Sequence, residues 1–173
     1  KAGIDSNAVE DVIMGCGMPQ GTQSHNIARL CALSGDLPVT TAGMTIDRQC
    51  SSGMMAIATA SKSIMAGEHD IMIAGGLESI SLVQNEHVNM HRVIDKNLIA
   101  KHEHIYMQML DTAEVVANRY NVTREQQDAY ALQSQQRTAI AQQAGKYDDE
   151  IVPLTSSMGV MDRETGKISF KDV

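Results

Sequence analysis

The chain has 173 residues and a formal net charge of −7 at pH 7. Its composition, 43% hydrophobic and 20% charged, allows a buried core and excludes a disordered chain. The acidic balance and the lack of a basic cluster argue against a nucleic-acid partner. No apolar run approaches the roughly 18 residues that a membrane span needs, so we expect no membrane segment.

The chain contains three cysteines, Cys16, Cys31 and Cys50. An odd number without paired spacing predicts free thiols rather than a disulfide framework, which suits a reducing compartment. No signal peptide is recognisable at the first residues, so we expect a cytoplasmic protein. No CxxC pair occurs, and we therefore expect no structural zinc and no other metal.

Short apolar runs alternate with helical patterns along the first 80 residues. The predicted elements are a strand at Val12–Met14, a helix at Thr22–Leu33, a strand at Val39–Ile46, a helix at Ser51–Ala66 and a strand at Ile71–Ala74. This alternation predicts an α/β fold with a parallel sheet and helical crossovers.

The predicted helix at Ser51–Ala66 is apolar on all sides. Lys62 is its only charged residue, and Ala, Met, Ile, Gly and Ser fill most of its other positions. A helix of this composition is buried on most of its surface. We therefore expect other elements to cover both of its faces.

The composition of the sequence becomes more polar after Ser79. We place a domain boundary near residue 80, between a core segment at 1–80 and an inserted or appended region at 81–173. In this second region we expect a helix capped by Asp111, with Glu114 at capping-box spacing.

Three further elements are expected towards the carboxyl end. Thr123 and Gln126 have the spacing of a second capping box, which opens a polar helix that runs to about Gly145. Ile151–Leu154 is strand-like, and Val160–Phe170 has the pattern of a hairpin.

The segment from Asp47 to Gly53 carries the strongest chemical signal, because a cysteine stands where a strand ends and an apolar helix begins. A helix amino terminus favours the reactive thiolate, and its free N–H groups can hold a developing oxyanion. Gly53 weakens the first helical turn, which indicates close approach by a ligand or another backbone. The residues alone leave two interpretations of Cys50 open, a nucleophile and a small buried side chain.

Four segments, in order, resemble the thiolase family. Cys50 and its surroundings resemble the nucleophile signature N-R-x-C-x-S-G, and Gly75–Ser81 resembles G-G-x-E-S-M-S. Gly17–Gly21 with Asn26–Arg29 resembles the family's Gly-Gln…Asn-x-Ala-Arg segment. The fourth match, to the loop-domain pattern T-A-E…R-x-x-Q-D…A-x-x-S-Q, comprises Thr112–Glu114, Arg124–Asp128 and Ala131–Gln135.

Small departures from the family pattern bear on acyl-chain preference. Asp47 replaces the usual Asn, and Ile80 replaces the usual Met. In the stretch that the resemblance assigns to pantetheine contact, Met109 matches a family Met, while Gln108 stands where some members have His. The resemblance thus implies Met109 and Gln108 as substrate-binding candidates.

The resemblance implies the layered thiolase fold and ping-pong acyl transfer through Cys50, with coenzyme A as a substrate and no cofactor. The expected partners are acyl-CoA, CoA and further copies of the chain in a homodimer or tetramer. The family's Gly-His-Pro base and C-x-G acid/base motifs are absent, so we expect an incomplete enzyme: most of the N-terminal half plus part of the loop domain. The alternatives are a ketoacyl synthase and a non-catalytic fragment that only folds, dimerises or binds acyl-CoA.

Two weaker patterns compete with this interpretation. Gly15 and Gly17 after a strand resemble a dinucleotide loop, but Gln20 occupies the place of its third glycine. His87 and His91 are spaced for one helix face, yet no carboxylate or cysteine accompanies them as a metal site requires. We expect the histidines to lie on a solvated loop.

Overall fold

The computed structural model describes residues 2–173, which form two compact units that divide between Lys96 and Asn97. The division falls later than residue 80 because the segment after the last strand of unit 1 stays with that unit. The short helix α3 (Ile80–Val83) packs against the 3-10 helix η2 (Gly21–Gln23). The Asn89 N–H also donates to Gln20 Oε1 at 3.0 Å.

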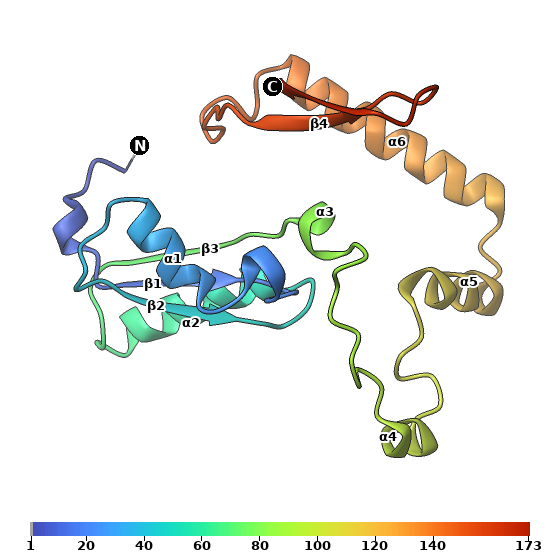
Figure 1. Ribbon diagram of the computed structural model, residues 1–173, viewed down its shortest axis with the longest axis horizontal. Coiled ribbons are helices and arrows are strands. Elements are labelled where there is room, and N and C mark those ends of the chain that lie inside the picture. Colours follow the sequence, from blue (N-terminus) through green and yellow to red (C-terminus); the bar gives the residue numbers. More distant parts are fainter. Residues whose placement is uncertain (1) are drawn as a thin grey trace. The chain divides into compact units, whose positions relative to one another are not determined.

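A parallel three-stranded sheet forms the centre of unit 1 (Figure 1). Its strands are β1 (Asp11–Gly15), β2 (Ala42–Ile46) and β3 (Met72–Gly76), in the order β2-β1-β3. Gly15 is level with Ile46 on one side and with Gly76 on the other, so all three strands end together. The predicted α/β class with a parallel sheet is confirmed.

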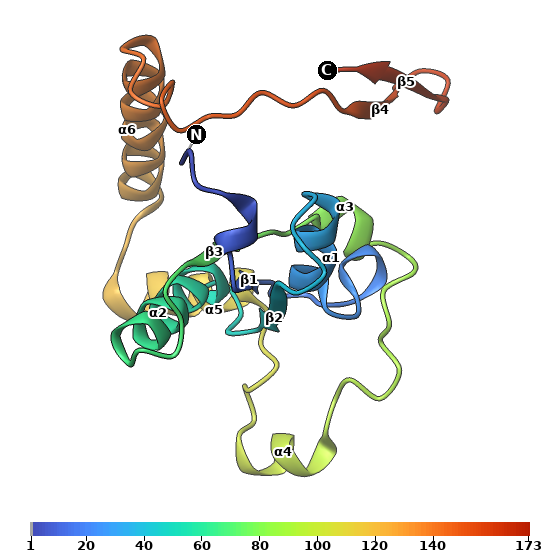
Figure 2. The same cartoon turned by 90° about the vertical axis from the view of Figure 1, so that its left-hand side faces the viewer.

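Successive side chains of β1 face opposite sides of the sheet, and a helix covers each side (Figure 2). Val12 packs against Ala32 of α1 (Ile27–Ser34), in a cluster that also holds Val9. Ile13 packs against Ala56 and Ala60 of α2 (Ser52–Met65). Small alanines on both helices allow the helix backbones to lie close to the strands.

The outer face of α2 is exposed, although we expected both of its faces to be covered. Only Ser52, Ala56 and Ala60 of this helix are buried. Met54 is 75% exposed and Met65 is 85% exposed. The described residues thus cover one face of an apolar helix and leave the other in contact with solvent.

Two predicted elements of unit 1 are shorter than expected. The helix predicted from Thr22 begins only at Ile27, because His25 has a left-handed φ of 60° and the Asn26 side chain caps α1 by accepting from the Arg29 N–H. The strand predicted from Val39 begins only at Ala42. Before it, residues 38–41 form a turn in which the Thr41 N–H donates to Pro38 O at 3.0 Å, and the Val39 and Thr41 carbonyls accept hydrogen bonds from the Arg29 guanidinium.

Unit 2 contains helices followed by a hairpin. The helix α4 (Lys96–Lys101) spans the division, and α5 (Met109–Tyr120) and α6 (Arg124–Gln143) follow it. The strands β4 (Ser157–Met161) and β5 (Ile168–Asp172) pair antiparallel, which confirms the predicted hairpin. A further 3-10 helix, η1 (Ser6–Ala8), precedes β1 in unit 1.

The helix ends of unit 2 test the capping predictions. Thr123 and Gln126 form the predicted capping box at the start of α6. The prediction that Asp111 is a cap is wrong, because α5 begins at Met109 with Gln108 at its cap position. Ile151–Leu154 is not a strand: the Ile151 N–H donates to Tyr147 O, and Pro153 has no N–H with which to pair.

Close backbone contacts join the ends of β1 and β3 to the first turn of α2. A Cβ built on Gly15 would lie 2.2 Å from the Ser52 carbonyl carbon, and one on Gly76 would lie 3.2 Å from Gly53 Cα. A Cβ on Gly53 would instead meet Gly76 Cα at an ordinary 3.8 Å. The close approach anticipated at Gly53 therefore depends mainly on the glycines of the strands.

Gly15→Ala is expected to destabilise the chain by at least roughly 1–3 kcal/mol, the usual cost of overpacking, because the new methyl group would overlap the Ser52 backbone. Gly53→Ala is the matched control and is expected to leave the free energy of unfolding unchanged or to raise it by up to about 1 kcal/mol. Urea unfolding followed by circular dichroism measures both. Equal stability of the two variants would contradict the assigned contact.

Candidate active site

Cys50 lies in the turn that connects β2 to α2, at the edge of the sheet where all three strands end. Its side chain is exposed. The next residue, Ser51, is the cap of α2, so the thiol stands at the amino terminus of a 14-residue helix. This is the strand-to-helix position that the sequence predicted.

Hydrogen bonds within the turn hold its unusual backbone. Gln49 has a left-handed φ of 49°, which is uncommon outside glycine. Asp47 Oδ1 accepts from the Gln49 N–H at 2.7 Å, and Ser52 Oγ accepts from the Arg48 N–H at 2.9 Å. The Ser52 hydroxyl in turn donates to the Gln49 carbonyl at 2.5 Å. The side chains on either side of Cys50 thus shape the turn.

The backbone N–H groups of the turn differ in availability. The Ser51 N–H donates to Arg48 O and the Ser52 N–H to Gln49 O, both at 3.1 Å. Among the described residues of the turn, the Cys50 N–H is therefore the candidate donor to an oxyanion. Donors that are already in place at such a position stabilise developing charge without reorganisation.

A second thiol, Cys16, lies on the neighbouring loop but is buried, with 1% of its surface exposed. Burial raises the pKa of the Cys16 thiol, and the Glu78 and Asp47 carboxylates raise this pKa further. The sulfur lies 3.9 Å from Glu78 Oε1. Cys16 is therefore a poor candidate for a nucleophile.

Glu78 and Gln23 are two polar residues of this edge that we did not single out as site residues. Glu78 Oε2 accepts from the Gly17 N–H at 2.8 Å, and Gln23 is 2% exposed. The G-G-x-E-S-M-S resemblance contained Glu78 but no role for it. Gln23 lies in a segment that we expected to be helical. Its polar side chain was visible in the sequence, but its burial is known only from the structure.

The substrate-binding candidates Gln108 and Met109 belong to unit 2. Gln108 precedes α5, and its carbonyl accepts from the Thr112 N–H at 2.9 Å and from the Thr112 hydroxyl at 3.0 Å. Met109 is 75% exposed and lines a cavity of about 360 Å³ formed by α5 with Val122 and Gln127. Because Cys50 belongs to the other unit, a common site rests on the sequence resemblance.

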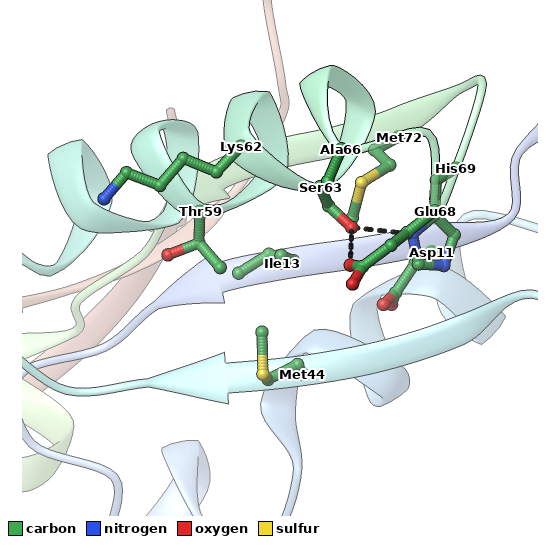
Figure 3. A pocket seen from close by; sticks show the side chains of 10 residues that line it. All are labelled: Asp11, Ile13, Met44, Thr59, Lys62, Ser63, Ala66, Glu68, His69 and Met72. Carbon is green, nitrogen blue, oxygen red and sulfur yellow. Dashed lines mark hydrogen bonds between the residues drawn. The ribbon is translucent and has the colours of Figure 1, made fainter.

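A cavity of about 420 Å³ lies at the opposite, amino-terminal end of the strands of unit 1, where Asp11 and Met72 begin β1 and β3 (Figure 3). In it the Ser63 hydroxyl lies 2.8 Å from Glu68 Oε2 and 2.9 Å from His69 Nδ1. A catalytic triad requires the histidine between serine and carboxylate. Here the serine is in the middle, so the cluster cannot relay a proton from Ser63 through His69 to Glu68.

Residues 2–173 contain neither a metal-binding cluster nor a membrane-spanning helix. No group of three or more His, Cys, Asp or Glu side chains in this range is arranged to hold a metal ion. No helix in the same range combines the length and apolar character needed to cross a membrane.

Comparison with known proteins gives consistent matches. A family model described as thiolase, N-terminal domain, matches residues 1–169. A 3-ketoacyl-CoA thiolase of Bacillus subtilis (strain 168) is 43% identical over 156 residues, which cover 89% of this chain and 39% of that protein.

Two further relatives extend the comparison. An acetyl-CoA acetyltransferase of Chromobacterium violaceum is 39% identical over 168 residues, covering 89% of this chain and 42% of that protein. A beta-ketoadipyl-CoA thiolase of Pseudomonas aeruginosa is 37% identical over 170 residues, covering 88% of this chain and 42% of that protein. The chain thus spans about two fifths of the length of these relatives.

The three thiols are expected to react with iodoacetamide in the order Cys50, Cys31, Cys16. Cys50 is exposed, Cys31 is half-buried, and Cys16 is buried with a raised pKa, which lowers the fraction of its thiolate. Peptide mapping by mass spectrometry after timed labelling measures the three rates. In concentrated urea the rates should become equal, and faster labelling of Cys16 than of Cys50 in the folded chain would refute the order.

Proposed function

The chain belongs to the thiolase family, and from that premise we propose that Cys50 is the nucleophile of an acyltransferase that forms or cleaves 3-ketoacyl-CoA. One observation carries the proposal. An exposed thiol stands at the amino terminus of α2, at the end of parallel strands, inside the segment that resembles the family's nucleophile signature. The helix dipole there favours the thiolate over the thiol.

The proposed reaction has two steps. The Cys50 thiolate attacks the thioester carbonyl of an acyl-CoA, and coenzyme A leaves as the acyl group is bound to sulfur. In the second step CoA takes the acyl group in the cleavage direction, or the α-carbon of acetyl-CoA takes it in the condensing direction. The Cys50 N–H supports the proposal, because the Ser51 and Ser52 N–H groups are already engaged and it is the candidate donor to the oxyanion.

Other groups are needed for full activity. A positioned base typically contributes about 10²–10⁴-fold in rate, and no histidine hydrogen-bonds to the Cys50 turn within residues 2–173. We propose that the base and a second cysteine come from sequence beyond the matched two fifths of the family's length. We also propose that Met109 and Gln108 contact the pantetheine arm of the substrate.

A second candidate function is favoured by the lack of a histidine bonded to the Cys50 turn within residues 2–173. In it, the chain folds, binds acyl-CoA or assembles without turnover. The ketoacyl synthase alternative is weaker, because the matching family model and the relatives above are thiolases or acetyltransferases.

In a full-length thiolase that contains this chain, Cys50→Ala and Cys50→Ser are each expected to lower acetoacetyl-CoA cleavage at least about a thousandfold. A serine hydroxyl is barely ionised where a thiolate is needed, and alanine offers no nucleophile. The rate of cleavage by CoA measures activity, and circular dichroism checks that the variants fold. Near-normal turnover in either variant would refute the role of Cys50.

The isolated chain 1–173 separates the two candidate functions. If Cys50 is a nucleophile whose general base is not present in the isolated chain, the chain should turn over little substrate. Acetyl-CoA should nevertheless slowly acetylate Cys50 and leave Cys31 unmodified. The Cys50→Ala chain is the control. Acetyl-CoA binding without acetylation would favour the non-catalytic alternative.

We also propose that the protein forms a homodimer or tetramer through unit 1. The strand β2 is an edge strand, and the segment 39–55 around it includes Val39, which is 80% exposed. Edge strands offer unpaired backbone groups to a second chain.

The Thr45→Pro variant is expected to shift the assembled protein toward smaller species, because proline would disrupt the backbone of the edge strand. Light scattering of the parent and variant proteins measures the change in mass. A parent protein that is a stable monomer would refute the proposed assembly.

A further inference from the structure

Three loops meet at the edge of the sheet that carries Cys50. They follow β1 at 16–20, β2 at 47–51 and β3 at 77–79. Backbone bonds already join their bases, from the Cys16 N–H to Ile46 O and from the Leu77 N–H to Gly15 O, both at 3.0 Å. The three loops therefore begin at one edge whose backbone is hydrogen-bonded, and side-chain contacts connect them further.

The buried Gln23 side chain ties the first loop to the third. Its Nε2 donates to Met18 O at 2.9 Å and to Glu78 Oε1 at 2.5 Å, while its Oε1 accepts from the Ser79 N–H. Both amide hydrogens and the amide oxygen are thus used. No other uncharged side chain of similar length offers two donors and an acceptor in this arrangement.

The Glu78 carboxylate continues the connection to the backbone of the first loop. Its Oε1 accepts from Gln23, and its Oε2 accepts from the Gly17 N–H at 2.8 Å. Because both oxygens act as acceptors, an amide at this position would turn its NH₂ group toward a donor. The site therefore requires a carboxylate rather than merely a polar side chain.

Gly17 lies between Glu78 and the turn that holds Cys50. A Cβ built on Gly17 would lie 3.2 Å from the Gln49 carbonyl oxygen and 3.2 Å from Glu78 Oε2. Gly17 is therefore in close contact with both the Glu78 carboxylate and Gln49, the residue directly before Cys50 whose φ is left-handed. A displacement of Gly17 would displace the nucleophile turn.

Resting on the proposed role of Cys50, we propose that Glu78 and Gln23 are positioning residues that hold Gly17 against Gln49 and so keep the Cys50 sulfur at the amino terminus of α2. Neither side chain needs to touch the substrate. Their effect is to fix the loop backbone on which the left-handed Gln49, and with it the direction of Cys50, depends.

The rate of Cys50 alkylation by iodoacetamide in chain 1–173, measured at one fixed pH, tests the proposal. If Glu78→Gln releases the turn, the sulfur leaves the helix terminus, and the rate at Cys50 should fall about threefold. Removing a nearby negative charge alone would raise the rate, so the two effects have opposite signs. Asp47 and Arg48, the charges within the turn, stay unchanged.

Gly17→Ala tests the same connection without a change of charge. Its methyl group needs Gln49 or Glu78 to shift by only a few tenths of an ångström, so the fold should survive. We again expect slower alkylation of Cys50, with the rate at Cys31 unchanged. Glu86→Gln is the matched control, since Glu86 is exposed and pairs with His87 at 3.5 Å, and it should alter the rate of neither thiol.

An unchanged or raised rate of Cys50 alkylation in folded Gly17→Ala overturns the proposal, as does a raised rate in folded Glu78→Gln. Labelling of Cys31 at its urea rate would show that a variant is unfolded, and if Glu78→Gln is unfolded, Gly17→Ala decides the test. Failure of the proposed function has a different signature, namely no acetylation of Cys50 in the parent chain. The change in rate is measured between variant and parent, so it tests positioning in either case.

Discussion

The space between the ends of β1 and β3 and the first turn of α2 is too small for a Cβ atom at Gly15. This constraint fixes how far α2 can advance along the sheet, and hence where Ser52 and the preceding turn lie. Ser52 then accepts from Arg48 and donates to Gln49, which shapes the backbone around Cys50. The position of the Cys50 thiol thus depends on the close contact between Gly15, at the end of β1, and Ser52, at the start of α2.

Side-chain alternation in β1 explains why a short sheet can be covered on both faces. Val12 and Ile13 belong to separate apolar clusters, one under α1 and one under α2. The family-like Asn-x-Ala-Arg segment serves the α1 side: Asn26 caps the helix, Ala28 is buried, and Arg29 binds the chain before β2. Here the segment has a structural role.

Local patterns in the sequence predicted the order of elements, because apolar runs and capping residues act over a few positions. The Thr123 capping box is such a signal, and the structure confirms it. Long-range contacts were not predictable in this way. Arg29 binds the carbonyls of Val39 and Thr41 just before β2, and Gln23 bonds to Glu78, 55 positions away along the chain. The sequence singled out Cys50 because its motif is contiguous, whereas Gln23 and Glu78 are far apart along the chain.

The strand order β2-β1-β3 has a consequence for synthesis of the protein on the ribosome. The central strand emerges first, yet its second neighbour, Met72–Gly76, appears only after about sixty more residues. Until then one edge of Asp11–Gly15 has no partner strand, and nascent chains in this state are open to pairing with one another. The time needed to translate the residues between these two strands therefore determines how long this edge of β1 remains without a partner strand.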